Sequence, residues 1–381
     1  MKNIQISPSY KPAYYYGGPT MSVSKLCEEL QIAGLSPIVL TTTANGNAEL
    51  PAKSVLVDGV AVRYFKRITK DPTHYSPDLF KALKGILRHR QQEPTLIHIH
   101  SWWNIVTLFS CWIAKKAKVA VVLSPRGMLT QYTLGNRNSI IKSVIHRFIG
   151  QGLIRYCHVH ATSEQEKRDI LKIITPKSIT IIPNFVRFPV DYNTSGAQND
   201  GQFKLIFLAR IEEKKGVDIL FQSLSQLAFN WRLTIAGAGS EAYVQELKKQ
   251  ASRLNINHQI NWIGQVRDED KFCLLAQHDL MVLPSHNENF ANSVIESLAV
   301  GTPVLISAHV GLADYVVEHN LGWISVLHPD SFASALTLIH NHASERKRIR
   351  EQAPSIIHAD FHPKKIVGQY LTLYDYAIKH G

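Results

Sequence analysis

The feature that most constrains the fold of this 381-residue chain is a repeated alternation of short apolar runs with longer helical patterns. Such alternation is typical of β-α units, in which helices connect parallel strands and cover the sheet. The helices expected between strands include 19–33 and 139–149. Strands are expected at 3–7, 37–41, 96–100, 119–123, 158–162 and 179–182, and in a second series at 203–208, 232–236, 259–263, 280–283 and 304–306. The pattern predicts an α/β protein with two parallel sheets.

A polar, turn-rich segment separates the two series of strands. Residues 191–202 are rich in Asn, Ser, Gly and Asp, so we expect a linker there. The chain is also too long for one ordinary hydrophobic core. We therefore expect an N-terminal domain at 1–190, a C-terminal domain at 203–362 and a helical tail at 363–381.

Positive charge is concentrated in the N-terminal half. Residues 1–185 hold 24 Lys and Arg against 10 Asp and Glu, whereas residues 186–381 hold 18 against 20. A basic face attracts nucleic acid, anionic lipid or a polyphosphate substrate. Because no segment resembles a nucleic-acid module, we expect an anionic membrane surface as partner, with a merely solvated basic surface as the alternative. The amphipathic pattern at 140–149 fits a helix on a membrane or a helix packed in the core.

The cysteines and the apolar runs bear on location. The four cysteines lie far apart, which is typical of reduced core thiols in a cytosolic protein. The first residues lack the apolar region of a signal peptide, and no apolar run reaches the roughly 20 residues that span a bilayer. The expected location is cytoplasmic, with peripheral contact at the inner face of the cell membrane.

Two carboxylates, Glu288 and Glu296, are separated by seven residues where an apolar strand passes into a helical pattern. Eight residues of helix rise roughly 12 Å, whereas glycosidases place their two carboxylates only about 5–9.5 Å apart. The spacing therefore suits two contacts with an elongated ligand such as a nucleotide-sugar. Phe290, Ala291 and Asn292 open the expected helix, whose free N–H groups form an anion site.

Two cations follow the first strand of the second series. Arg210 and Lys215 could stabilise the negative charge that develops on a departing diphosphate, or they could be solvated surface charges. If they supply this charge, the reaction requires no metal ion and no cofactor. His98 and His100 share one face of a strand but lack a third ligand, which argues against zinc.

Glycine turns and strand ends supply the other candidates. Gly17 and Gly18 allow a close backbone approach to a phosphate or an acceptor sugar. Arg126 cannot act as a base but can hold a phosphate or carboxylate through two hydrogen bonds. His100 either reaches the acceptor or packs in the core. We also expect Gly237, Gly239 and Val266 to contact the nucleotide-sugar.

Together, these segments resemble the retaining glycosyltransferases of family 4. The similar segments are the E-x7-E pair, residues 208–216, residues 17–20 and residues 301–305. The resemblance implies the GT-B architecture: two facing Rossmann-like domains with an interdomain cleft, the donor on the C-terminal side and the acceptor on the N-terminal side. It also implies that the last helix crosses back to the first domain, that Glu288 binds the transferred hexose and that Glu296 binds the ribose.

Two positions depart from the family pattern. Arg126 stands where the family often has histidine, and Phe185 follows Asn184 where glycine is usual. An arginine there suits an acceptor that carries phosphate, such as a polyprenyl-diphosphate-linked glycan.

The sequence thus predicts a retaining hexosyltransferase that uses a UDP- or GDP-sugar and a glycan acceptor, in surface polysaccharide or glycoconjugate synthesis. A nucleotide-sugar epimerase of the same fold and a non-enzymatic module that binds anionic glycan or lipid are the alternatives.

Overall fold

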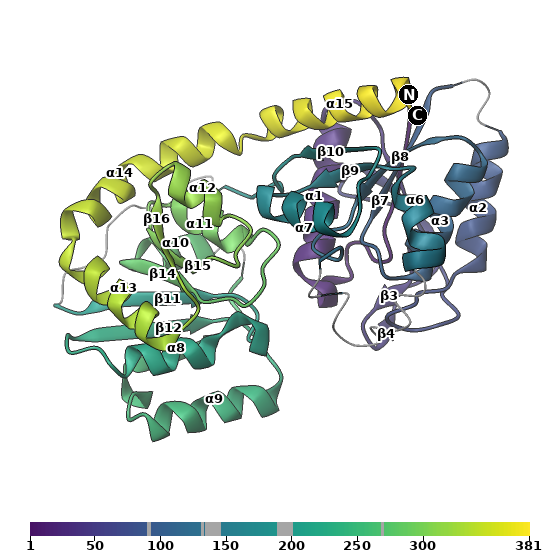
Figure 1. Cartoon of the computed structure of the whole chain (residues 1–381). Coiled ribbons are helices and arrows are strands. Elements are labelled where there is room, and N and C mark those ends of the chain that lie inside the picture. The colour runs from purple at the N-terminus through teal and green to yellow at the C-terminus, as the bar shows by residue number, and fades with distance from the viewer. Residues whose placement is uncertain (90–92, 131–132, 134–145, 189–200, 268–269) are drawn as a thin grey trace. The chain divides into compact units, whose positions relative to one another are not determined.

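The computed structural model describes residues 1–89, 93–130, 133, 146–188, 201–267 and 270–381 (Figure 1). It divides into two compact units, one made of Met1–Phe185 with Pro363–Gly381 and the other of Val186–His362. Most of the predicted linker, 191–200, and residues 139–145 of the predicted helix at 139–149 lie outside the described residues.

The first unit is built on an eight-stranded sheet with the order β10-β9-β8-β7-β1-β2-β6-β5. Its strands are β1 (Lys2–Ile6), β2 (Ile38–Thr42), β5 (Ser54–Val57), β6 (Val60–Phe65), β7 (Thr95–His100), β8 (Ala120–Ser124), β9 (His158–Ala161) and β10 (Ser178–Ile181). Its helices include α1 (Gly18–Ile32), α2 (Pro77–Arg88), α3 (Ile105–Lys116), α6 (Gln151–Ile154) and α7 (Glu164–Ile173). All six residues of β7 are buried, as suits a central strand covered on both faces.

One edge of this sheet differs from the prediction of parallel strands. β5 pairs antiparallel with β6 through a turn at Asp58-Gly59, and neither strand is among the predicted elements. An Asp-Gly pair between two apolar runs is a strong hairpin signal, so the sequence does contain the information.

The second unit has a six-stranded sheet, all parallel, with the order β13-β12-β11-β14-β15-β16. Its strands are β11 (Phe203–Leu208), β12 (Trp231–Ala236), β13 (Ile260–Gly264), β14 (Leu280–Leu283), β15 (Val304–Ser307) and β16 (Gly322–Ser325). Its helices are α8 (Val217–Leu224), α9 (Glu241–Arg253), α10 (Lys271–Ala276), α11 (Asn292–Ala299), α12 (Ala313–Glu318), α13 (Pro329–Asn341) and α14 (Ala343–Asp360). The strand order reverses between β11 and β14, and ligands of open α/β sheets bind at such a switch point.

The last helix, α15 (Pro363–Lys379), belongs to the first unit (Figure 1). It packs on β7 and β8 with Tyr370 and Tyr374 fully buried. The Tyr374 hydroxyl lies 2.8 Å from Nδ1 of His98, so the helix joins the interior of this unit through polar as well as apolar contacts.

The cysteine prediction is wrong at one position. Cys27, Cys111 and Cys157 are buried free thiols, whereas Cys273 is exposed. Cys273 lies on α10, which buries Phe272, Leu275 and Ala276 and leaves its other face to solvent. No helix among the described residues has both the length and the apolar composition needed to cross a bilayer.

Candidate active site

An ion pair lies at the switch point of the second unit. Lys215 ends a short 3-10 turn (Glu213–Lys215) after β11, and Glu288 follows β14. The Lys215 ammonium group contacts the Glu288 carboxylate, and their side chains are only 9% and 21% exposed. The sequence predicts that Lys215 contacts the leaving diphosphate and that Glu288 contacts the hexose. In the structure these two residues are direct neighbours.

Backbone hydrogen bonds hold the loops that carry this pair. The Lys214 carbonyl accepts from the His286 amide at 2.8 Å and from the Ser285 hydroxyl at 3.0 Å. The Glu288 amide donates to the His309 carbonyl at 3.1 Å, and the Gly311 amide donates to the Glu288 carbonyl at 2.7 Å. The segments after β11, β14 and β15 are thus joined to one another, which fixes the position of both charged residues.

Gly216 permits the close approach of two of these segments. Its φ of +68° lies in the left-handed region, and a Cβ there would meet the carbonyl oxygen of Pro284 at 2.0 Å. Any other residue would push the segment after β14 away from Lys215. The glycine is therefore required by backbone packing.

The second carboxylate has its own lysine. Nζ of Lys271, the first residue of α10, lies 2.6 Å from Oε1 of Glu296 on α11, and both side chains are 12% exposed. Lys271 is absent from the predicted site. No motif links positions 271 and 296, so only the packing of α10 on α11 could reveal it.

The predicted helix between the two glutamates is wrong in its bounds. α11 begins at Asn292, preceded by Ala291 at a φ of +69°. The backbone of Glu288 pairs with residues around Val310 instead, so a helical rise does not set the separation of the two carboxylates. Phe290 is buried and packs against Phe361, so its side chain faces the interior of the unit. Of the predicted anion-binding residues, only Asn292 belongs to the helix.

Arg210 is not brought to Glu288 in this structure. Its guanidinium pairs with Glu212 at 2.7 Å, and its side chain is 53% exposed. Glu212 also pairs with Lys214 at 3.3 Å. An ion pair this exposed contributes little to stability, so Arg210 can exchange this partner for a ligand at small cost.

Close backbone packing explains the two glycines after β12, Gly237 and Gly239. A Cβ on Gly237 would meet the Ala209 carbonyl oxygen at 1.8 Å, and one on Gly239 would meet that of Ile211 at 2.4 Å. Both glycines therefore let the segment after β12 lie against the segment after β11. Val266, two residues beyond β13, is half-buried at the same edge of the sheet.

In the first unit, hydrogen bonds of the preceding residue hold the start of the loop at Gly17 and Gly18. Gly17 has a φ of +60° and Gly18 is the first residue of α1, with Pro19 next to it. The preceding residue, Tyr16, donates its hydroxyl hydrogen to Asp71 at 2.8 Å and accepts from the Gly46 amide at 3.1 Å. Gly17 and Gly18 thus follow a side chain that is fixed by two other loops.

Arg126 lies at the carboxyl end of β8, in a turn with a φ of +53°. Its Nη1 donates to Oδ1 of Asn184 at 3.0 Å, and burial lowers the pKa of its guanidinium. The Nε of Arg126 is buried and has no hydrogen-bond partner among the described residues. A half-buried guanidinium with one unpaired N–H group is suited to bind an anion.

A buried carboxylate holds the Arg126 turn, and it is absent from the predicted site. Glu166 accepts from the Gly127 amide at 2.6 Å and from the Thr162 amide and hydroxyl at 2.7 Å. The sequence signal was present, because Ser163-x-x-Glu166 is a capping-box pattern and the Ser163 hydroxyl does accept from the Glu166 amide. What the pattern does not reveal is the contact with Gly127.

Of the two alternatives for His100, contact with the acceptor or packing in the core, the structure supports packing in the core. His100 is 1% exposed, and its Nε2 lies 2.8 Å from Oε1 of Gln5. It adjoins a buried chain in which the Ser124 hydroxyl lies 2.6 Å from both His98 and His160. Burial holds the pKa of His98 and His100 well below the usual range and lowers that of His160 to about 3.

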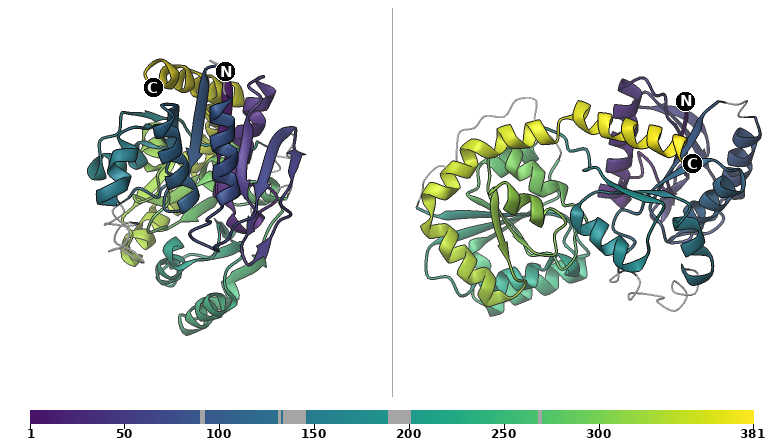
Figure 2. Two further views of the ribbon diagram at one scale, coloured as in Figure 1. Left: turned by 90° about the vertical axis from the view of Figure 1, so that its right-hand side faces the viewer. Right: turned by 45° about the horizontal axis from the view of Figure 1, so that its top comes forward.

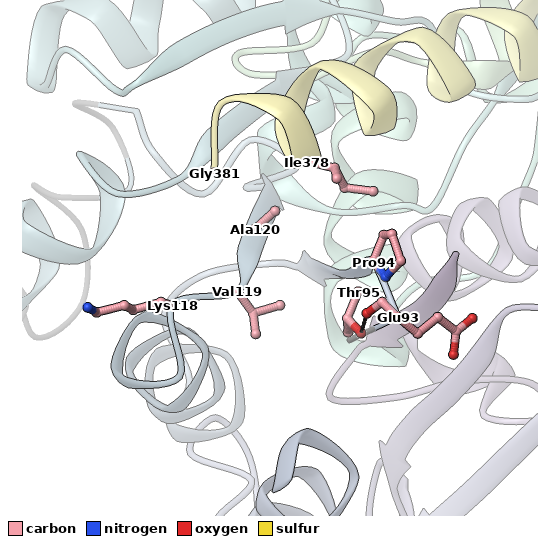
Figure 3. Close-up of a pocket in the computed structure, with 8 residues that line it drawn as sticks. All are labelled: Glu93, Pro94, Thr95, Lys118, Val119, Ala120, Ile378 and Gly381. Carbon is pink, nitrogen blue, oxygen red and sulfur yellow. Dashed lines mark hydrogen bonds between the residues drawn. The ribbon is translucent and has the colours of Figure 1, made fainter. Parts of the chain in front are cut away.

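A pocket of about 270 Å³ lies at the opposite edge of this sheet (Figure 3). It is formed by the amino ends of β7 and β8 and by the end of α15, and is lined by Glu93, Pro94, Thr95, Lys118, Val119, Ala120, Ile378 and Gly381. It contains none of the candidate site residues, which gather beyond the carboxyl ends of the strands. Within the described ranges, no three His, Cys, Asp or Glu side chains are grouped so as to hold a metal ion.

Comparison with known proteins agrees with this geometry. The "Glycosyl transferase 4-like domain" family matches residues 17–184, and the "Glycosyl transferases group 1" family matches residues 192–355. The uncharacterized glycosyltransferase MJ1607 of Methanocaldococcus jannaschii is 24% identical over 58% of this chain and 57% of its own length. The D-inositol 3-phosphate glycosyltransferase of Thermomonospora curvata is 24% identical over 87% of this chain and 84% of its own.

The fold is likewise shared with solved structures. Anabaena Alr3699/HepE, solved in complex with UDP, has a TM-score of 0.74 at 18% identity and covers 99% of this chain and 100% of its own. Two Rossmann-like units of this kind make up the GT-B fold, so the predicted fold class is confirmed. Since the two family matches together span most of the sequence, the chain belongs to the family 4 glycosyltransferases.

Proposed function

We propose that this glycosyltransferase moves a hexose from a UDP- or GDP-sugar to a glycan acceptor with retention of the anomeric configuration. The observation that carries the proposal is the Lys215–Glu288 ion pair at the switch point of the second unit. A fixed ammonium group beside a carboxylate offers one contact for a diphosphate and one for sugar hydroxyls. The UDP bound in the Alr3699/HepE structure supports testing UDP-sugars first.

The proposed step breaks the bond between the anomeric carbon and the β-phosphate oxygen and forms a bond to the acceptor oxygen on the same face. The acceptor proton passes to the departing phosphate, so no protein base is required. Lys215 stabilises the charge that develops on the diphosphate, where positioned cations act most strongly in the transition state. Glu288 binds the hexose hydroxyls, and Glu296, oriented by Lys271, binds the ribose.

On the acceptor side, we propose that Arg126 binds a phosphate of a polyprenyl-diphosphate-linked glycan beside the loop at Gly17 and Gly18. The orphaned Nε of Arg126 and the Glu166 carboxylate that fixes the next amide support this assignment. Such an acceptor places the enzyme at the inner face of the cell membrane, in surface polysaccharide or glycoconjugate synthesis.

A ligand screen tests the donor assignment. Thermal unfolding would be followed with UDP, GDP and their hexose conjugates. The same measurement on Glu296→Gln, which removes the carboxylate assigned to the ribose, would show whether any stabilisation comes from this site. A ligand at a hundredfold excess over its Kd stabilises the folded state by about 2.7 kcal/mol, and the variant is expected to lose that gain. The proposal fails if neither nucleotide stabilises the wild-type protein.

Product analysis tests the reaction itself. In the presence of an acceptor, NMR is expected to show a product with the anomeric configuration of the donor. Conversion of the nucleotide-sugar into its epimer without an acceptor would instead identify an epimerase, and an inverted product would contradict retention.

A further inference from the structure

Exposed aromatic side chains and lysines share one face of the first unit. On α3, Phe109, Trp112, Lys115 and Lys116 are all exposed, and they recur at the three- and four-residue spacing of one helix face. Arg147, Phe148 and Ile149 lie in the turn His146–Gly150 that comes before α6. All three are exposed, Phe148 to 78% and Ile149 to 53%. We call these seven residues the aromatic–basic face.

The two segments of this face adjoin each other. α3 packs against both α2 and α6, and the three helices lie beside one another on one side of the sheet (Figures 1 and 2). Nζ of Lys115 donates to the Gly152 carbonyl of α6 at 2.8 Å. The helix that carries Phe109 and Trp112 is therefore in contact with the helix that follows Phe148 and Ile149.

The segment of sequence that carries this face is basic. Between Glu93 and Glu164 the chain contains eight Lys and Arg residues and no Asp or Glu. Nζ of Lys116 lies 5.2 Å from the centre of the Trp112 ring, which places a cation directly beside an exposed aromatic side chain. Exposed Phe and Trp side chains beside lysines suit the interface of an anionic bilayer. There the rings enter the headgroup region, and the cations contact lipid phosphates.

We infer that the aromatic–basic face binds an anionic lipid bilayer, through insertion of Phe148 and Trp112 and contact of Lys116 and Arg147 with lipid headgroups. This deepens the membrane contact of the proposed function by naming the surface. A second copy of this chain would not match the face equally well, because two faces of the same positive sign repel each other.

The test is co-sedimentation of the full-length protein with vesicles of phosphatidylcholine alone and of phosphatidylcholine mixed with phosphatidylglycerol. Wild type is expected to bind the anionic vesicles and to dissociate as salt is raised. Each cation removed is expected to weaken partitioning about fivefold, so Lys116→Ala/Arg147→Ala should lose roughly 30-fold. Phe148→Ser should weaken binding without changing its dependence on salt.

Matched controls lie on the second unit. Lys249→Ala/Arg253→Ala on α9 removes two exposed cations, and Leu338→Ser on α13 removes a half-exposed apolar side chain. These variants are expected to bind as wild type does. Circular dichroism and nucleotide release from the donor, neither of which requires a membrane, would show that every variant is folded.

Three results would overturn the inference: equal binding to neutral and anionic vesicles, wild-type binding by both face variants, or equal losses in the controls. A wild-type dimer in analytical ultracentrifugation that dissociates on Phe148→Ser would assign the face to self-association. Because vesicle binding is measured without turnover, its failure would leave the proposed reaction untouched.

Discussion

Lys215 offers the sharpest test of the donor site. Lys215→Ala removes the ammonium group from the ion pair with Glu288 and leaves that carboxylate, 21% exposed, without its cation. Breaking a fully buried ion pair costs about 3–5 kcal/mol of stability, and an exposed pair contributes about 0–1 kcal/mol. Because Glu288 keeps some access to water, we expect a loss of about 2 kcal/mol. A domain of ordinary stability remains folded after such a loss.

The effect on rate is expected to be larger than the effect on stability. A positioned group that stabilises transition-state charge contributes about 10²–10³ in rate, or roughly 2.7–4 kcal/mol. Lys215→Ala should therefore lower kcat by that factor at saturating donor. The assay is release of UDP or GDP from the nucleotide-sugar, measured beside chemical denaturation of the same preparation.

Lys271→Ala is the matched control, because it breaks an ion pair of similar burial with Glu296. Its stability loss should be similar, but its main kinetic effect should be a higher KM for the donor, since Glu296 is assigned to the ribose. Wild-type kcat in Lys215→Ala, or equal losses of kcat in both variants, would refute the leaving-group role of Lys215.

Two further predictions concern the framework of the site. Gly216→Ala should destabilise the protein by about 1–3 kcal/mol and reduce donor affinity, because the new Cβ would meet the Pro284 carbonyl. Chemical denaturation would measure the loss of stability, and the ligand screen would measure the loss of affinity. Unchanged stability and affinity would show that the backbone adapts to the new side chain. His160, whose pKa burial lowers to about 3, stays neutral in the folded state at pH 5, whereas an unfolded histidine with a pKa near 6.5 is protonated. Unfolding is therefore favoured as pH falls below about 6.5, and His160 alone should contribute a loss of about 2 kcal/mol at pH 5. Denaturation of wild type and His160→Gln between pH 7 and pH 5 would test this, because the variant should lose less stability over that interval.

Much of the architecture could be predicted from local patterns. The alternation of apolar runs and helical stretches is enough to predict two α/β units. Lys215 and Glu288 stand out because they follow strand ends, and Glu296 stands out because seven residues separate it from Glu288. Burial periodicity and glycine turns act over a few residues, so they are visible in the sequence. The β5–β6 hairpin shows that a local signal can also be overlooked.

What only the tertiary structure decided is which side chains meet. Lys271 contacts Glu296, which lies 25 residues away in the sequence, and Glu166 contacts Gly127, which lies 39 residues away. His100 is buried by residues from distant segments. The left-handed turn at Ala291 and the pairing of Glu288 beside β15 likewise override the helical pattern between the two glutamates. Local sequence determines which strands and helices form, but ion pairs and burial depend on which of these elements are packed side by side, and that follows from the order of strands in the sheet.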